Sequence, residues 1–341
     1  MQHQTHLVLT SEALHGNAVS RPYSNGSTTP TPILKSVASH WLIPALAGII
    51  GLALGSFLNV CIVRLPADES VISPRSRCPH CHAQLRWYDN IPLFSYLLLR
   101  GRCRDCHERI SWRYPAVELA VALWFVVSFW PFTQPLPGDF DPIMQLTLRC
   151  FATACIGWFL IGLAVTDWRE HILPSDLTYG GIFVGLAITC MQAFFLDSQQ
   201  DDVVLKHKIN INSANAGRST GNVFLTGPEF HIFSHIFAAA AAFLLLYAIR
   251  AVYKALRKRD GMGLGDAKLL AMIAAFLGFA PTAIALALGI FLATLYAVLL
   301  LIRGKANAAT RLPFGSFLAV AGMFAALYGQ RIADSYLALF R

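Results

Sequence analysis

The sequence predicts an all-α fold, a polytopic membrane helix bundle of about eight transmembrane helices with a cytoplasmic zinc-type loop domain built on four cysteines. Of the 341 residues, 55% are apolar and only 13% are charged, whereas a soluble domain has about 25% charged residues. The apolar residues form long runs, as expected for helices that cross a bilayer. Two Cys-x-x-Cys pairs also lie together in the polar segment after the first run.

The first 40 residues differ from the rest of the chain. The segment 1–40 is rich in Ser, Thr, Pro and His and lacks the apolar core of a secretory signal peptide. We interpret it as a disordered N-terminal extension, because it has few apolar side chains to bury. An alternative is that translation starts further downstream and this segment is not made. The first transmembrane helix is expected at 41–63.

Eight apolar runs predict the transmembrane helices. They are 42–63, 114–132, 147–166, 177–196, 231–250, 267–280, 282–302 and 314–333. A helix needs about 20 residues to cross the hydrocarbon, and the sixth run is short because it ends at Pro281. Gly51 and Gly55 in the first run favour close packing against a neighbouring helix.

The distribution of lysine and arginine predicts the topology, because cytoplasmic loops carry an excess of both. Nine of the 27 basic residues lie in 64–113, which we therefore place inside. The net charge of +8 then arises from basic residues in the loops between spans. Because these residues do not form one basic face, nucleic acid is not an expected partner. Residues 197–230, rich in Asn, Ser, Gln and Asp, form an outside insertion in this arrangement.

Two acids are expected at the cytoplasmic ends of apolar runs. Asp167 closes one run, and Asp266 follows a glycine-rich break within 261–268. A carboxylate at membrane depth is costly and indicates function, and two carboxylates that share one proton can hydrolyse a peptide bond. Gly263 and Gly265 lack a Cβ, so we expect them to form an active-site loop that turns sharply and approaches substrate closely.

Simpler interpretations of the acids remain open at this point. Each Asp is also compatible with a helix cap or a helix-end residue at the membrane interface. Glu170 and Asp176 lie near Asp167, and spacing alone does not exclude them as the partner of Asp266. Glu118, in the second run, is interpreted as a structural residue.

The four cysteines of the polar loop predict a structural zinc site. They are Cys78, Cys81, Cys103 and Cys106. Two Cys-x-x-Cys pairs are typical of tetrahedral Zn²⁺, and the reducing cytoplasm disfavours disulfides. Alternative ligands are His80, His82 and His107, and reduced cysteines without metal are the other possibility. The arginines of this loop could bind anionic membrane lipid, bind an acidic substrate segment, or serve topology alone.

Several motifs together resemble the prepilin peptidase family, also called type IV leader peptidases. The matching segments are 55–66, the tetracysteine loop, 90–96, 100–103, 110–115, Glu118 and 261–270. The resemblance covers about 44–333. It departs from the family pattern at Arg169, where the family often has an acid, and at Asp176, which is shifted by one position.

This resemblance implies an eight-span aspartic peptidase of the bacterial inner membrane with its active site facing the cytoplasm. Such enzymes cut the basic leader from type IV prepilins and pseudopilins, and many then N-methylate the new N-terminus with S-adenosylmethionine. The family's catalytic acids match Asp167 and Asp266. By this resemblance, 64–113 is a region associated with methyl transfer and 114–341 is the transmembrane peptidase domain.

Three other functions are compatible with parts of the pattern. Intramembrane acids and broken helices also occur in transporters, but 167–174 and 261–268 share little beyond the acid. A membrane methyltransferase without protease activity would not require Asp266. A binding scaffold built on the zinc loop is the third alternative.

Overall fold

The structure is a computed structural model. It describes residues 33–73, 76–78, 80–134, 140–209, 228–258, 263–304 and 312–339. Throughout these ranges the regular structure is helical, and the extended pairing is limited to two isolated β-bridges. The predicted all-α class is therefore confirmed.

Nine α-helices and three short 3-10 helices make up the described chain. They are α1 (Ile33–Arg64), η1 (Leu65–Ala67), η2 (Trp87–Asn90), α2 (Phe94–Leu98), α3 (Arg113–Ser128), η3 (Trp130–Thr133), α4 (Phe140–Glu170), α5 (Ser175–Ile209), α6 (Pro228–Arg257), α7 (Leu264–Leu277), α8 (Phe279–Ile302) and α9 (Phe314–Ala338). Each of the eight predicted spans overlaps one of these α-helices. In the described chain, six helices are long and apolar enough to cross a membrane, whereas α3 and α7 have only 16 and 14 residues.

Two helices extend further than the apolar runs. Helix α1 begins at Ile33, inside the segment expected to be disordered, while 1–32 lies outside the described residues. Helix α5 continues to Ile209, and α6 begins at Pro228, so 197–230 contributes to both helices. Hydropathy locates only the part of a helix that suits lipid, and internal hydrogen bonds allow the helix to continue into polar sequence. The remainder of the insertion, 210–227, lies outside the description.

Helix α7 is the centre of the bundle. Ten of its 14 residues are buried, and it contacts α4, α5, α6, α8 and α9. Glycines make this close packing possible, because a Cβ at Gly181 would overlap Sδ of Met272 and one at Gly185 would lie 2.7 Å from Phe276. Helix α8, by contrast, is mostly exposed and apolar, as expected for a lipid-facing helix.

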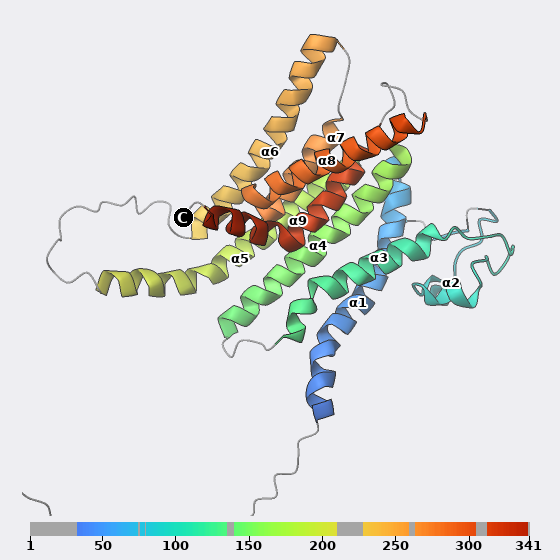
Figure 1. The fold of residues 1–341 in the computed structure, drawn as a ribbon. Helices are drawn as coiled ribbons and strands as arrows, with labels where there is room; N and C mark the ends of the chain where they lie inside the picture. The colour runs from blue at the N-terminus through green and yellow to red at the C-terminus, as the bar shows by residue number, and fades with distance from the viewer. Residues whose placement is uncertain are drawn as a thin grey trace, which may run out of the picture.

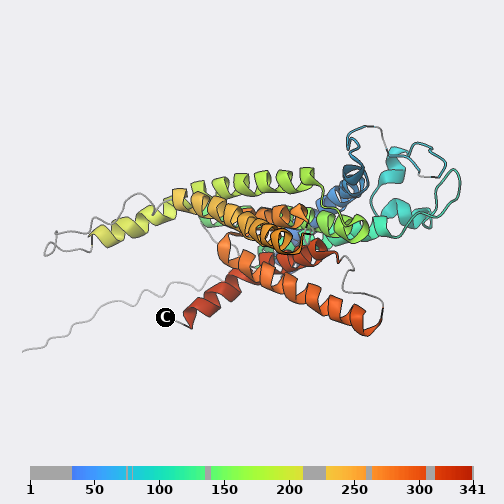
Figure 2. The ribbon, with the colours of Figure 1, turned by 90° about the horizontal axis from the view of Figure 1, so that it is seen from above.

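Helices α1 and α3 form a tight pair beside the central bundle (Figure 1). A Cβ at Gly51 would lie 2.8 Å from Cα of Ala122, and one at Gly55 would lie 2.7 Å from Cα of Glu118. The predicted close packing of these glycines is confirmed. The segment between the two helices, including α2, projects beyond one end of the bundle, whereas the C-terminal part of α5 projects at the other (Figures 1 and 2).

Candidate functional site

Asp167 lies on the last turn of α4, where it meets the start of α9. Its side chain is buried, with 5% of the residue exposed. The backbone N–H of Ser316 donates to Oδ2 of Asp167 at 2.6 Å, and Oγ of Ser316 lies 3.0 Å from the same oxygen. Hydrogen bonds to an ionised acceptor are strong, and the positive end of a helix dipole favours a carboxylate. The contacts with Ser316 therefore favour the ionised carboxylate of Asp167, whereas its burial disfavours that form.

Asp266 lies in the first turn of α7, as predicted, and is 9% exposed. Gly263 is the N-cap residue of this helix, and its backbone N–H bonds to the Asp266 carboxylate. Asp266 is therefore not the N-cap, although it makes the return bond of a capping box. Gly263 has extended backbone and an open surrounding, and the side chain nearest to a Cβ placed there is that of Asp266, at 3.7 Å. This open position lies next to the acid.

The structure brings Asp167 and Asp266 together at one end of the bundle. Both acids adjoin Leu173, although 99 positions separate them in sequence. Leu173 packs beside the pair, since a Cβ at Gly265 would lie 2.8 Å from it and one at Gly315 would lie 2.9 Å from it. A Cβ at Gly315 would also lie 3.0 Å from Oδ2 of Asp167. Gly265 thus serves close packing, rather than the sharp turn expected from the sequence.

The rival acids lie elsewhere. Glu170 is exposed and pairs with Arg169 at 3.7 Å, and Asp176 is exposed in the first turn of α5. Glu118 is buried in α3, where Oε2 accepts the backbone N–H of Leu93 at 2.8 Å. None of these contacts involves Asp266, so Asp167 is the acid that the fold places beside it.

The sequence analysis assigned no role to two polar residues near the acids, Ser316 and Lys268. The backbone N–H of Ser316 donates a hydrogen bond to Asp167. The ammonium of Lys268 donates to Oγ of Ser175 at 2.8 Å, and it also lies 4.7 Å from the ring centre of Tyr179. The signal for Ser316 is the run of Pro, Phe, Gly and Ser before the last apolar segment, which is typical of a helix start. Lys268 ties the beginning of α7 to the beginning of α5.

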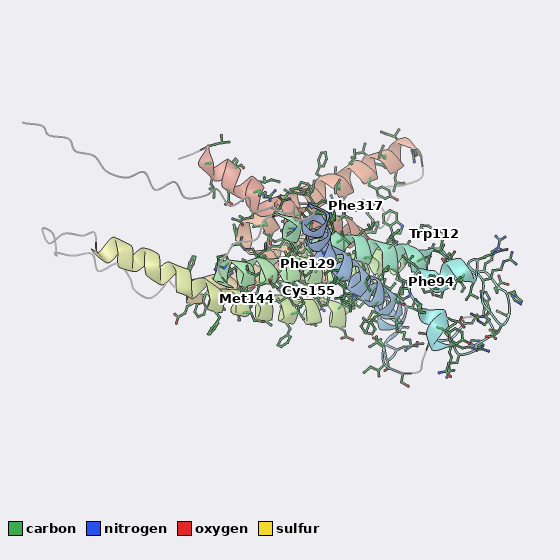
Figure 3. The ribbon with its side chains drawn as sticks, turned by 90° about the horizontal axis from the view of Figure 1, so that it is seen from below. Phe94, Trp112, Phe129, Met144, Cys155 and Phe317 are labelled. Carbon is green, nitrogen blue, oxygen red and sulfur yellow. The ribbon has the colours of Figure 1, made fainter. Side chains whose placement is uncertain are left out.

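An aromatic cluster lies next to Asp167 on the outer side of α4. Trp168 is 52% exposed, and its ring centroid lies 5.7 Å from Tyr296 of α8 and 6.2 Å from Phe317 of α9. The rings of Tyr296 and Phe317 lie 5.2 Å apart. Phe317 is labelled in Figure 3. The cluster forms a partly exposed apolar surface beside the end of α4 that carries Asp167.

The four loop cysteines converge on one point. All four Sγ atoms lie within 4.8 Å of one another. Cys78 and Cys106 are 3.8 Å apart, and Cys81 and Cys103 are 4.0 Å apart. Tetrahedral zinc with Zn–S bonds of about 2.3 Å requires sulfur atoms about 3.8 Å apart. The cysteines therefore fit Zn²⁺, and the three neighbouring histidines are not members of the cluster.

The two cysteine pairs form equivalent knuckles. In the first, the N–H of His82 donates to the carbonyl of Cys78 at 3.0 Å; in the second, the N–H of His107 donates to that of Cys103 at 3.1 Å. Both histidines have a left-handed backbone, with φ of 56° and 57°. An isolated β-bridge closes each knuckle, Arg77 with Gln84 and Arg102 with Arg109. The shared sequence is Arg77-Cys78-x-x-Cys81-His82 and Arg102-Cys103-x-x-Cys106-His107.

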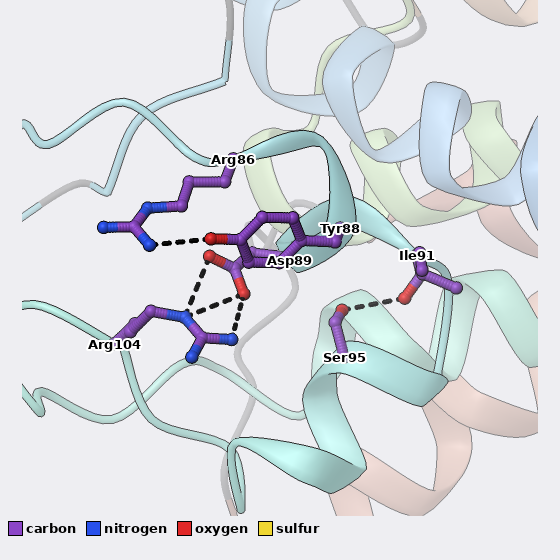
Figure 4. Close-up of polar contacts among 6 residues, drawn as sticks. All are labelled: Arg86, Tyr88, Asp89, Ile91, Ser95 and Arg104. Atoms are coloured by element: carbon purple, nitrogen blue, oxygen red, sulfur yellow. Dashed lines mark hydrogen bonds and ion pairs between the residues drawn. The ribbon is translucent and has the colours of Figure 1, made fainter.

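Local contacts favour the thiolate of Cys78, and an ion pair joins two parts of the loop. Desolvation raises the pKa of Cys78, but hydrogen bonds from the backbone of Cys81 and His80 outweigh it and lower the pKa to about 7. A bidentate ion pair joins Arg104 of the second knuckle to Asp89 of η2, with Nη2 2.6 Å from Oδ1 (Figure 4). The Arg104–Asp89 ion pair and the converging cysteines therefore connect separate parts of the loop.

A pocket of about 390 Å³ lies between this loop and helices α1 and α3. Its volume falls within the range of small-molecule sites. Neither Asp167 nor Asp266 lines it, so the described chain contains two separate candidate sites. The pocket's lining includes Asn59, Cys78, Tyr96, Cys103, Tyr114 and Glu118.

Comparison with known proteins identifies the family. The family model for the bacterial peptidase A24 N-terminal domain matches 49–132, and the model for the type IV leader peptidase family matches 215–298. The chain is 30% identical over 336 residues to a prepilin leader peptidase/N-methyltransferase of Stutzerimonas stutzeri, covering 92% of this chain and 99% of that protein. The chain belongs to the type IV leader peptidase family.

Other relatives agree in name and coverage. A prepilin leader peptidase/N-methyltransferase of Pseudomonas aeruginosa is 30% identical over 90% of this chain and 98% of its own length. The protein of the same name from Aeromonas hydrophila is 31% identical over 88% of this chain and 96% of its own length. No solved structure matches at a comparable level. The family resemblance predicted from sequence motifs is confirmed.

The first matched region contains one candidate site, and the second contains one of the two acids of the other site. The 49–132 region contains the cysteine cluster and every residue of the pocket. The 215–298 region contains Asp266, while Asp167 lies between the two matches. The pocket of the loop segment and the two buried acids are therefore separate candidate sites in the described chain.

Proposed function

We propose that this chain is an aspartic endopeptidase of the bacterial inner membrane that removes the basic leader from type IV prepilins or pseudopilins. The observation that carries the proposal is the burial of both Asp167 and Asp266 at one end of the bundle, where both adjoin Leu173. Two adjacent carboxylates do not both ionise easily, so one retains a proton, as peptide hydrolysis by an acid pair requires. The names of the relatives supply the substrate class.

The surroundings of the two acids suggest their roles. Ser316 and the start of α9 stabilise charge on Asp167, so Asp167 is the base that takes a proton from water. Asp266 holds the shared proton and donates it to the carbonyl oxygen as the water attacks. When the tetrahedral intermediate collapses, the leaving amine takes a proton from the pair and the peptide bond breaks.

The route of the substrate follows from the surfaces around the acids. The aromatic cluster of Trp168, Tyr296 and Phe317 lies beside Asp167 and is open to membrane lipid in this proposal. An apolar helical stem can lie there within the bilayer, while a basic leader stays in water. The positive-inside rule assigns the acids to the cytoplasmic face, because the alternation of spans puts them on the same side as the arginine-rich loop.

The cysteine cluster has a structural role in this proposal. Cys78, Cys81, Cys103 and Cys106 would hold Zn²⁺ with four protein ligands, which leaves no open position for catalysis. The metal would supply folding energy to the loop domain. The second activity is N-methylation of the new N-terminus with S-adenosylmethionine as donor, as the names of the relatives suggest.

The proposal is tested by incubating the purified full chain in detergent with a prepilin, with and without S-adenosylmethionine. Mass spectrometry of the product should show loss of the leader in both samples, and the added mass of one methylene group only with the donor. A matched prepilin whose cleavage-site residues are scrambled should stay intact. An uncut prepilin with folded enzyme would contradict the peptidase, and a cut but unmethylated product would contradict only the transferase.

A further inference from the structure

We propose that S-adenosylmethionine binds in the pocket between α1, α3 and the loop domain, with Glu118 as the carboxylate that receives its positive charge. This inference rests on the proposed methyl transfer and names the site where it occurs. The pocket lies within 49–132 of the described chain, has a volume of about 390 Å³, and is separate from the paired acids.

Glu118 is the residue that carries the inference. It is buried, with 8% exposed, and lines the pocket. Its carboxylate accepts the N–H of Leu93 at 2.8 Å and also bonds to Ser56. Neither partner is charged, and no salt bridge in the described chain involves Glu118. A carboxylate offers about four acceptor sites, and a buried charge is stabilised by an opposite charge. A cationic ligand would supply that charge.

The other walls suit the remaining parts of this donor. S-Adenosylmethionine combines a sulfonium, a flat adenine ring and an amino-acid end. Tyr96, Tyr114 and Leu85 offer ring faces and apolar surface for the adenine, and Arg64 adds a cation to the lining that suits the carboxylate of the amino-acid end. Asn59 donates to the carbonyl of Tyr114 at 3.0 Å, which fixes α1 against the start of α3.

Helix α1, which lines the pocket, packs against α4, the helix that carries Asp167. Leu58, next to Asn59 on α1, packs against Gly162 of α4, where a Cβ would lie 2.7 Å from its side chain. Gly162 is five residues before Asp167 on the same helix.

The methyl transfer from S-adenosylmethionine to the new N-terminal amine needs no further reactant. The new terminal ammonium first loses a proton to water, and the amine's lone pair then attacks the methyl carbon. The carbon–sulfur bond breaks, and its electron pair stays on sulfur, giving a neutral thioether and a methylated ammonium. Glu118 holds the sulfonium before the transfer and has no cation to hold afterwards, which favours release of the spent donor.

The test locates the donor by a readout independent of activity. The full chain in detergent is irradiated with tritiated S-adenosylmethionine, and the labelled peptides are mapped. Equilibrium binding is measured for Glu118→Gln, which keeps an acceptor for Leu93, and for Leu85→Trp, which fills the pocket. The matched controls are Glu69→Gln and Leu97→Trp, both at exposed positions outside the pocket lining.

We expect label within 56–118, and binding weakened by about tenfold or more in both pocket variants. The controls should bind like wild type, and all forms should still cut prepilin. Label elsewhere, wild-type binding by both pocket variants, or no binding by wild type would overturn the inference while leaving the peptidase proposal intact. Loss of cleavage in every form would instead contradict the peptidase, and the label would still report on the pocket.

Discussion

Ser316, at the start of α9, donates its backbone N–H to Oδ2 of Asp167, on the last turn of α4, at 2.6 Å. The two residues are 149 positions apart, and their bond fixes the acid against a helix N-terminus. The serine hydroxyl lies 3.0 Å from the same oxygen and 2.9 Å from the carbonyl of Ala164. Asp167 is therefore oriented by a residue on another helix.

The hydroxyl of Ser316 should contribute to cleavage by stabilising the charge on Asp167. Ser316→Ala keeps the backbone N–H but removes one charge-assisted contact, and such contacts contribute about 1.5–3 kcal/mol. We expect prepilin cleavage to slow by about tenfold or more. Thr294→Ala is the control, because its hydroxyl bonds within α8. Equal rates for the two variants would show that the hydroxyl is dispensable.

Gly315 should be intolerant of any side chain. A Cβ there would lie 3.0 Å from Oδ2 of Asp167 and 2.9 Å from Leu173, so Gly315→Ala should displace the carboxylate and nearly abolish cleavage. Gly180→Ala is the matched control, because nothing lies within 4 Å of that position. Initial rates of leader removal provide the measurement. Full activity of Gly315→Ala would mean that the site tolerates a shifted acid.

The cysteine cluster should be required for metal binding but not for proteolysis. Cys103→Ser removes one of four thiolates, so we expect loss of bound zinc, measured by elemental analysis, and loss of methyl transfer. Cleavage should persist, since the acids lie outside the loop domain. Cys190→Ser, at an exposed cysteine of α5, should retain zinc. A zinc-free wild type with both activities would contradict this role.

The ion pair between Arg104 and Asp89 should stabilise the loop domain. Arg104→Lys preserves the charge but removes the bidentate contact seen in Figure 4. We expect limited proteolysis to cut the loop several times faster, with little change in cleavage of prepilin. Arg100→Lys is the control, at another position of the same segment. Equal proteolysis of both variants would show that the pair adds nothing to loop stability.

Much of this arrangement could be predicted from sequence because the bilayer imposes simple rules. Long apolar runs predicted the helices, and Cys-x-x-Cys spacing predicted the cysteine cluster. A functional role for Asp167 and Asp266 was predicted because carboxylates at membrane depth are energetically costly. Helix ends were less predictable, because α1 and α5 continue beyond their apolar parts.

The contacts across helices could not be predicted. Ser316 is an ordinary serine in sequence and becomes important only because α9 begins beside the end of α4. The glycine-rich pattern predicted a bend at Gly265, yet this residue lies within α7 and makes room for Leu173. The sequence indicated only a structural role for Glu118, and its place on a pocket wall depends on how the loop folds over α3. Such relationships follow from tertiary packing.

The most direct test of the paired-acid mechanism is cleavage of a prepilin in detergent by wild type, Asp167→Asn and Asp266→Asn. Asparagine keeps the size and removes the titrating group, so each variant should fold, remain in the membrane and leave the leader attached. Asp176→Asn is the matched control and should cut like wild type, because this residue is exposed in the first turn of α5. Retained cleavage by both single variants would contradict the mechanism.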